Sequence, residues 1–254
     1  ESSAASDVYK RQVLRSPADQ AAKREFRRRL EQKYGDIAKL NAAWKSSYAS
    51  WDAFLNETAL PDLNAAREDL KVFDNAIIDR YFQGCRNAVR RFLPGKLYLG
   101  SRFERYENVP RAEVVAAAAK YCDVLSFNLY CYSVADFRLP GGVDKPVLIG
   151  EFHFGTISNG HANPGITGCA DNAERADAYR FYLKTALRHP NFVGCHYYRL
   201  IDEHPAGRLI DNENMGIGFV DICDRPYPEM VQAAREIGAD MYLSLIHISE
   251  PTRH

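Results

Sequence analysis

A carboxylate at the end of an apolar segment is the feature of this sequence that most directly suggests chemistry. The segment reads Lys-Pro-Val-Leu-Ile-Gly-Glu-Phe-His-Phe-Gly over residues 145–155, and Glu151 is its acidic residue. Proline is suited to the start of a strand, and the apolar residues that follow bury the body of that strand. Glu151 is therefore expected where the strand leaves the core. An ion pair with an arginine such as Arg102 or Arg199 is the structural alternative.

The ends of other apolar segments also carry polar or aromatic side chains. These ends are Ser101-Arg102-Phe103-Glu104, Asn128-Leu129-Tyr130 and His196-Tyr197-Tyr198-Arg199. Glycoside hydrolysis uses two carboxyl groups, one that attacks the anomeric carbon or activates water and one that protonates the leaving oxygen. Glu151 supplies only one of them. The remaining candidates are Glu104, Asp202 and Glu203, and for each an ion pair or a substrate hydrogen bond is the favoured interpretation.

The elements that position these groups alternate between helices and short apolar strands. Helices are predicted at residues 17–34, 61–92, 110–120, 171–188 and 226–242, with a short helix and a structured loop within 36–57. Strands are predicted at residues 96–103, 124–130, 147–152 and 192–199. Strands that are apolar on both faces and separated by helices indicate an α/β fold with a parallel sheet covered by helices.

An open doubly wound sheet and a closed barrel share this alternation. The polar strand ends favour the barrel, because the carboxyl ends of all its strands meet at one mouth where active sites lie. No glycine-rich phosphate loop follows any strand, which disfavours a nucleotide-binding sheet. Four strands are half of the number that a (β/α)8 barrel needs. We therefore predict a partial TIM barrel with strands five to eight, their helices, and the helices that follow strand four.

The composition excludes several classes of function. Of 254 residues, 46% are hydrophobic and 26% are charged, and 33 basic side chains balance 33 acidic ones. These values are typical of a globular protein and give no indication of a nucleic-acid or anionic-membrane partner. No apolar run is long enough to span a membrane. The six cysteines lack C-x-x-C spacing, so buried free thiols are expected rather than a zinc site. Neither a metal nor a cofactor is expected.

Three segments of the chain carry a family resemblance. They are Ile149 to Gly155, the run NAERADAYRFYLKTALRHPNFVGCHYYRLID at 172–202, and MGIGFVDICDRPYPEMVQAARE at 215–236. Together they resemble the β-agarases of glycoside hydrolase family 50. The run YGDIAKLNAAWKSSYASWDAF at 34–54 resembles a stretch that recurs there and in the related family 42 β-galactosidases, just after the fourth strand. The resemblance covers essentially all of Val13 to Tyr242 and implies a retaining barrel glycosidase.

The resemblance also implies roles for individual residues. Glu151 is the expected nucleophile at the end of the seventh strand, and Tyr130 is the expected residue whose hydroxyl orients it. The expected substrate contacts are Arg102, Glu104, Asn128, His153, His196, Tyr197 and Asp202. For His153 and His196 a buried, structurally satisfied histidine is the alternative. Where the family tends to carry tryptophan after the eighth strand, this chain has Tyr197 and Tyr198, which leaves the identity of the substrate open.

The second carboxyl group is expected outside this chain. In the family that the chain resembles, the acid/base is a glutamate that follows an asparagine at the end of the fourth strand, immediately before the helix at 17–34. That dipeptide is absent there, and Asn56-Glu57 is rejected because it follows a loop rather than a strand. The chain alone is therefore expected to have negligible activity. It is also expected to self-associate through exposed barrel edges.

Both ends of the chain resemble translated sequencing-adapter sequence. The segments are Ser2 to Gln12 and Ser244 to Arg253, and ordinary termini are the alternative. We assign residues 1–12 and 244–254 to such sequence and residues 13–243 to the C-terminal half of a TIM-barrel glycosidase catalytic domain.

Several functional readings remain at this point. The expected substrate is a β-galactan or an agaro-oligosaccharide, and a β-galactosidase is the nearest alternative. A non-catalytic carbohydrate-binding or scaffold protein could reuse the same fold. An open α/β enzyme for a phosphorylated ligand is disfavoured by the lack of a phosphate loop. Breakdown of a polysaccharide would favour a secreted or periplasmic parent protein.

Overall fold

The computed structural model describes residues 11–104 and 110–249, with side chains as far as residue 242. The chain divides into two compact units, residues 1–85 and 86–254, and the boundary falls within helix α5. The helices are α2 (Ala21–Tyr34), α3 (Ile37–Trp44), α4 (Trp51–Asn56), α5 (Arg67–Phe92), α6 (Ala112–Tyr121), η1 (Pro140–Gly142), α7 (Asn172–Arg188) and α8 (Pro228–Ser249), and the strands are β1 (Arg102–Glu104), β2 (Leu125–Asn128), β3 (Val147–Phe152) and β4 (Phe192–Tyr197).

The first unit is a small helical domain with an aromatic core. Phe26 of α2 stacks on Phe73 of α5 at a centroid distance of 4.5 Å, and Trp44 and Phe54 close around Phe26. The Asp36 and Ser50 side chains accept hydrogen bonds from the first turns of α3 and α4, which satisfies backbone groups that a helix start leaves free. Packing of aromatic rings thus holds three short helices together that would be marginal alone.

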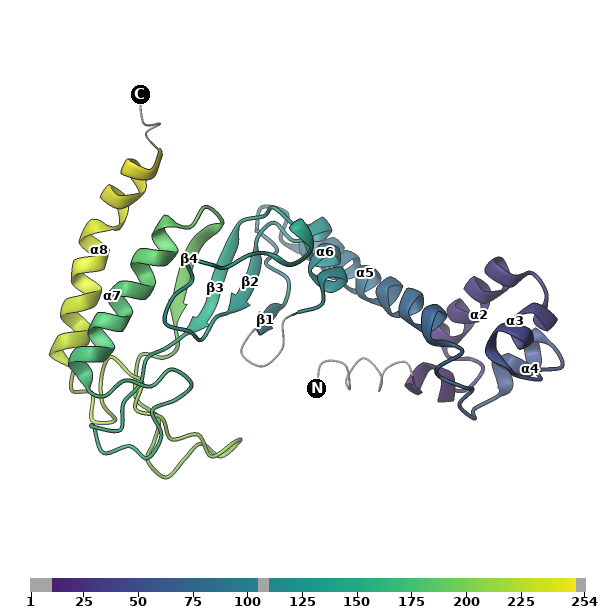
Figure 1. The fold of residues 1–254 in the computed structure, drawn as a ribbon, viewed down its shortest axis with the longest axis horizontal. Coiled ribbons are helices and arrows are strands. Elements are labelled where there is room, and N and C mark those ends of the chain that lie inside the picture. Colours follow the sequence, from purple (N-terminus) through teal and green to yellow (C-terminus); the bar gives the residue numbers. More distant parts are fainter. Residues whose placement is uncertain (1–10, 105–109, 250–254) are drawn as a thin grey trace. The chain divides into compact units, whose positions relative to one another are not determined.

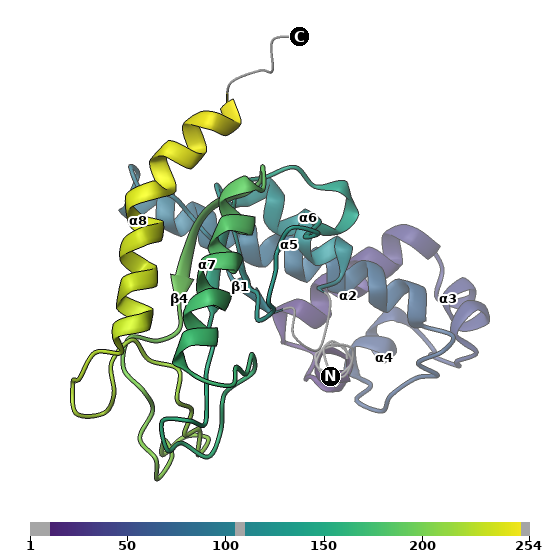
Figure 2. The same cartoon turned by 60° about the vertical axis from the view of Figure 1, so that its left-hand side comes forward.

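The second unit contains a four-stranded sheet that is parallel throughout. Its order is β1-β2-β3-β4, so each strand pairs with the next one in the chain (Figure 1). Helix α6 connects β1 to β2, the short helix η1 lies between β2 and β3, and helix α7 connects β3 to β4. Helices α7 and α8 lie side by side next to β4 (Figure 2). Phe152 of β3 stacks on Tyr182 of α7 at 4.3 Å, which identifies the face of the sheet that α7 covers. The predicted α/β fold with a parallel sheet is confirmed.

Some elements begin later than the sequence predicts. The helix predicted from residue 17 begins at Ala21, because the Gln20 side chain caps it by accepting a hydrogen bond from the Lys23 backbone. The strand predicted from residue 96 begins only at Arg102, because Gly100 has a φ of 68° that interrupts extended backbone.

The described residues include only part of the adapter-like chain ends, and they include all six cysteines. Most of the two adapter-like segments, 1–12 and 244–254, lies outside the described residues, while α8 continues to Ser249. All six cysteines are free, as expected, but only Cys122 is buried and Cys223 is exposed. Within the described ranges, no helix has the combination of length and apolar character that crossing a membrane requires.

Candidate active site

Strand β3 carries Glu151 to the carboxyl end of the sheet. Val147, Ile149 and Phe152 are buried, while the Glu151 side chain keeps 19% of its surface exposed. The register between β2 and β3 shifts by a bulge after Phe127, so that Asn128 lies opposite Glu151. Bulges of this kind redirect a side chain at the end of a strand.

Three donors, from β1, from β2 and from the loop after β2, surround the Glu151 carboxylate. Its Oε2 accepts hydrogen bonds from the Tyr130 hydroxyl at 2.7 Å and from the Asn128 amide at 2.9 Å. Its Oε1 forms an ion pair with Nη1 of Arg102 at 2.6 Å. The contact with Tyr130 and the alternative of an arginine ion pair are therefore both present. The carboxylate is fixed in one orientation by donors on either side.

Gly150 allows this close arrangement of donors. A Cβ atom at this position would lie 2.5 Å from Cδ of Arg102, 2.8 Å from Oγ of Ser126 and 3.0 Å from Oδ1 of Asn128. Any larger residue would displace the two side chains that contact Glu151. Close packing around position 150 therefore requires glycine immediately before Glu151.

Tyr130 remains a donor at neutral pH. Burial, together with the hydrogen bond to Glu151, raises the pKa of Tyr130 far above its usual value. The phenol therefore stays protonated and donates to the carboxylate. Its ring also lies 4.7 Å from the ring of His153, which packs beside it.

His153 is buried next to Tyr130. Its side chain is 1% exposed, and Nε2 accepts a hydrogen bond from the Ile166 backbone at 2.9 Å. Burial, with the nearby Arg175 cation as the next cause, lowers the pKa of His153 to about 4. His153 is thus a neutral, buried histidine that packs against Tyr130, and its contact with substrate stays a prediction.

Tyr197 and His196 occupy opposite faces of β4. The Tyr197 ring packs against Phe219 at 4.8 Å and Phe152 at 5.2 Å. Its hydroxyl lies 2.9 Å from the carbonyl oxygens of Phe154 and Ile217 and can donate to either, and the expected contact of Tyr197 with substrate stays a prediction. Successive residues of a strand point to opposite faces. The exposed His196 therefore faces away from the core that holds Tyr197.

The carboxylates after β4 are buried and engaged in holding the loop. Asp202 is 2% exposed and accepts hydrogen bonds from the Gly218 backbone and the Tyr227 hydroxyl, each at 2.5 Å. Glu203 is 1% exposed and accepts from the Met215 backbone. Both carboxylates thus hold the loop, and substrate binding by Asp202 stays a prediction.

The two remaining acidic candidates differ in their surroundings. Glu104 is exposed at the end of β1, opposite Asn128 in the parallel register. Asn56 ends helix α4 in the first unit and Glu57 follows it, so this pair does not terminate a strand. Among the residues that the structure describes, no group of three or more histidine, cysteine, aspartate or glutamate side chains is arranged to hold a metal.

Sequence reasoning missed two arginines that organise the loops around the site. Arg175 of α7 is fully buried and donates to the carbonyls of Phe154 and Gly218, so it joins the loops after β3 and β4. Arg208 lies in the loop after β4 and contacts Tyr198. An arginine in a helix pattern or in a long loop gives no sequence signal of such a role.

Most of the chain is similar in sequence to two β-agarases. No family model matches the chain. β-Agarase A of Vibrio sp. (strain JT0107) is 40% identical over 215 residues, and β-agarase B of the same strain is 35% identical over 229 residues. The matches cover 82% and 87% of this chain but 21% and 24% of the two agarases. The chain thus spans less than a quarter of these relatives.

Solved structures give the same result. An exo-β-agarase has a TM-score of 0.82 at 36% identity, with 92% of this chain and 32% of that chain covered. The protein PfGH50B has a TM-score of 0.80 at 36% identity over 91% of this chain and 33% of its own. The agarase AgWH50C has a TM-score of 0.79 at 35% identity over 93% and 34%, respectively.

Proposed function

Because this chain is related to the β-agarases of glycoside hydrolase family 50, we propose that it is the nucleophile-bearing part of a retaining glycoside hydrolase that cleaves β-galactosidic bonds in agarose or agaro-oligosaccharides. One observation carries the proposal: the partly exposed carboxylate of Glu151 is held at the end of a parallel strand by Tyr130, Asn128 and Arg102.

In the proposed reaction Glu151 is the nucleophile, and its three donors keep it in one orientation. Glu151 attacks the anomeric carbon of the galactose unit, a covalent ester forms, and the bond to the leaving oxygen breaks as that oxygen takes a proton from an acid. Water then hydrolyses the ester and releases the sugar with its original anomeric configuration. Tyr130 and Asn128 both donate to Oε2 of Glu151, and Arg102 forms its ion pair with the other oxygen, Oε1. Together they fix the orientation of the carboxylate.

The second carboxyl group is proposed to come from outside these residues. The four strands in consecutive parallel order, with polar residues at their carboxyl ends, support strands five to eight of a (β/α)8 barrel within residues 13–243. In the described residues, Asp202 and Glu203 are buried and each accepts hydrogen bonds that hold the loop after β4, which disfavours either as the second carboxyl group. A preceding segment would then supply the remaining strands and the acid.

The configuration of the first product tests this proposal. The full-length gene product is incubated with agaro-oligosaccharides, and the anomeric protons are followed by NMR from the first minute. We expect the β-anomer to appear first and the α-anomer to follow only by mutarotation. An α-anomer as the first product would contradict a glycosyl-enzyme at Glu151.

The ion pair with Arg102 favours a second candidate, a carbohydrate-binding protein that does not catalyse. In such a protein the ion pair would hold the sheet together and the carboxylate would only accept hydrogen bonds from sugar hydroxyls. Arg102 is 54% exposed, so it can also move aside when a sugar binds. Binding of agaro-oligosaccharides by the full-length product, without release of reducing ends over days, would support this second candidate.

A further inference from the structure

The segment after β4 folds back on itself around Arg208. The Arg208 backbone donates to Glu213, and the Asn212 backbone donates to Arg208, each at 2.9 Å. Gly207 has a φ of 87°, and a Cβ there would lie 2.9 to 3.1 Å from Asn212 backbone atoms. The turn is therefore built by its own backbone contacts and requires glycine at position 207.

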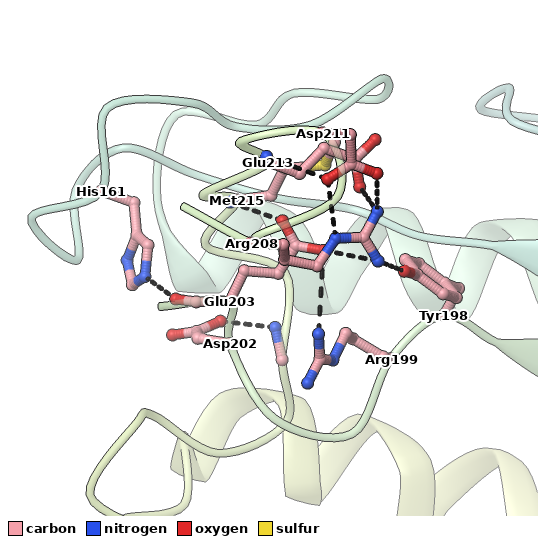
Figure 3. A network of polar contacts seen from close by, with 10 residues as sticks. His161, Tyr198, Arg199, Asp202, Glu203, Arg208, Asp211, Glu213 and Met215 are labelled. Atoms are coloured by element: carbon pink, nitrogen blue, oxygen red, sulfur yellow. Dashed lines mark hydrogen bonds and ion pairs between the residues drawn. The ribbon is translucent and has the colours of Figure 1, made fainter. Parts of the chain in front are cut away.

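The Arg208 guanidinium is held by carboxylates of this same turn. Nε and Nη2 donate to the two oxygens of Asp211 at 3.1 and 2.6 Å, and Nη2 also donates to Glu213 (Figure 3). Bidentate contact fixes the plane of a guanidinium group. The one remaining terminal nitrogen, Nη1, donates to the hydroxyl of Tyr198.

Glu203 supports this arrangement from the protein interior. Its side chain is fully buried, and Oε1 lies 3.6 Å from Nη1 of Arg208 without a hydrogen-bond partner of its own. Its backbone N–H donates to Met215 and its Oε2 accepts from the Met215 backbone, so the turn is joined at its base (Figure 3). The Arg208 guanidinium is thus surrounded by the carboxylates of its own turn, by the Tyr198 hydroxyl and by the buried Glu203 carboxylate.

Tyr198 connects this turn to the candidate active site. Its backbone N–H donates to the carbonyl of Phe152, the residue after Glu151, at 2.8 Å. Its ring lies 6.3 Å from that of His153, which contacts Tyr130. Because the Tyr198 oxygen accepts from Arg208, its hydroxyl hydrogen is free for another acceptor.

We infer that Arg208 is a positioning residue that holds the Tyr198 hydroxyl at the edge of the Glu151 site, where it donates a hydrogen bond to a hydroxyl of the galactose unit. This inference rests on the proposed function. Arg208 acts through Tyr198 and does not itself contact the sugar. Loss of its side chain would leave the Tyr198 ring free to rotate away.

A double-mutant cycle in the full-length gene product tests the inference. The variants are Arg208→Met and Tyr198→Phe, alone and combined, and the measurement is kcat/KM with agaro-oligosaccharides. Arg180→Met is the matched control, because Arg180 has similar exposure and also pairs with two carboxylates, Asp177 and Glu236, on helices outside the site. We expect Arg208→Met to lower kcat/KM about tenfold, Arg180→Met to change it less than twofold, and the effect of Arg208→Met to fall below twofold when Tyr198 is already phenylalanine.

A second measurement does not depend on activity. In protein labelled with fluorotyrosine, the resonance lost in Tyr198→Phe identifies Tyr198, and we expect Arg208→Met but not Arg180→Met to shift it. Equal effects of Arg208→Met in both backgrounds, or an unchanged Tyr198 resonance, would overturn the inference. Absence of hydrolysis by the wild-type protein, with a Tyr198 resonance that still depends on Arg208, would instead reject the proposed function and leave the positioning of Tyr198 established.

Discussion

Two carboxylates in this molecule, one in each unit, are held by nearly the same set of donors. Asp69 in the helical unit accepts hydrogen bonds from Lys33 at 2.5 Å, from the Tyr34 hydroxyl at 2.7 Å and from the Trp44 indole at 2.8 Å. Glu151 in the sheet unit is held by an arginine, a tyrosine hydroxyl and an asparagine amide. Each therefore has a cation, a phenol and a neutral N–H donor.

The surroundings of the two carboxylates differ, and the difference separates structure from function. The Asp69 side chain is 7% exposed, and Trp44, one of its donors, is fully buried in an aromatic core. Glu151 is 19% exposed at the end of a parallel strand. The cationic partners do not differ, since the side chains of Lys33 and Arg102 are each 54% exposed. A ligand can reach Glu151 and displace Arg102, whereas Asp69 is enclosed. The donor set alone does not define a catalytic carboxylate.

The largest expected effect is the loss of activity when the Glu151 carboxylate is replaced by its amide. Glu151→Gln removes the nucleophile but keeps the shape of the side chain, so we expect kcat of the full-length gene product to fall at least about 10³-fold. The midpoint of thermal unfolding should change little. Turnover is measured by release of reducing ends, and more than a tenth of wild-type turnover would exclude Glu151 as the nucleophile.

The matched change in the helical unit should have the reverse effect. Asp69→Asn leaves Lys33 without its charge partner and removes an acceptor from Tyr34 and Trp44, which we expect to lower the free energy of unfolding by about 2 to 4 kcal/mol. The kcat of the folded protein should stay within about twofold of wild type. Denaturant titration and a kinetic assay on the same sample check both values. A larger loss of kcat would show that the two units are coupled.

A methyl group at Gly150 should disturb the site without removing any donor. Gly150→Ala brings a Cβ into the space of Arg102 and Asn128, so we expect kcat/KM to fall about tenfold and the free energy of unfolding to fall by about 1 to 3 kcal/mol. Gly238→Ala in helix α8 is the control, since no atom lies within 4 Å of its added Cβ and it should stabilise by about 0.5 to 1 kcal/mol. Unchanged kinetics in Gly150→Ala would show that the donors around Glu151 tolerate displacement.

The smallest expected effect is a change with pH in the stability that the Asp69 contacts provide. Burial acts to raise the pKa of Asp69, but hydrogen bonds from Lys33, Trp44 and Tyr34 outweigh it and leave the pKa below its usual value of 3.8. A carboxyl group with a depressed pKa stabilises the fold fully above its unfolded pKa, and this contribution is lost as pH falls through the folded value. The stability difference between wild type and Asp69→Asn should therefore be constant from pH 7 to 5 and shrink below about pH 4. A difference that grows toward acid pH would contradict the assignment.

The sequence predicted the sheet and the central carboxylate but not the orientation of several neighbours. Apolar runs and helix periodicity located all four strands, and Glu151 and Tyr130 could be identified because they end such runs. His153 lies just after Glu151, and Tyr197 and Asp202 lie at the end of β4 and in the loop that follows, but all three side chains pack against other parts of the protein. Strand alternation sets the direction of Tyr197, and backbone N–H groups of the following loops hold His153 and Asp202, contacts that no local pattern predicts.

Loop geometry was the least predictable part of the site. Arg208 lies ten residues after Tyr198, and only the fold of the turn brings the two side chains together. Asn128 was expected to contact substrate, whereas its amide contacts Glu151 directly. Such contacts are tertiary, so they follow from register and loop closure rather than from residue type or spacing.

Covalent labelling of the nucleophile tests the central claim most directly. A 2-deoxy-2-fluoro-β-galactoside with an activated leaving group needs no acid catalyst, and its fluorine slows hydrolysis of the glycosyl-enzyme. After incubation with the full-length gene product, peptide mass spectrometry should find one fluorogalactosyl group on Glu151 and none on Asp69. A label on another carboxylate, or turnover of the reagent with no label on Glu151, would contradict the account.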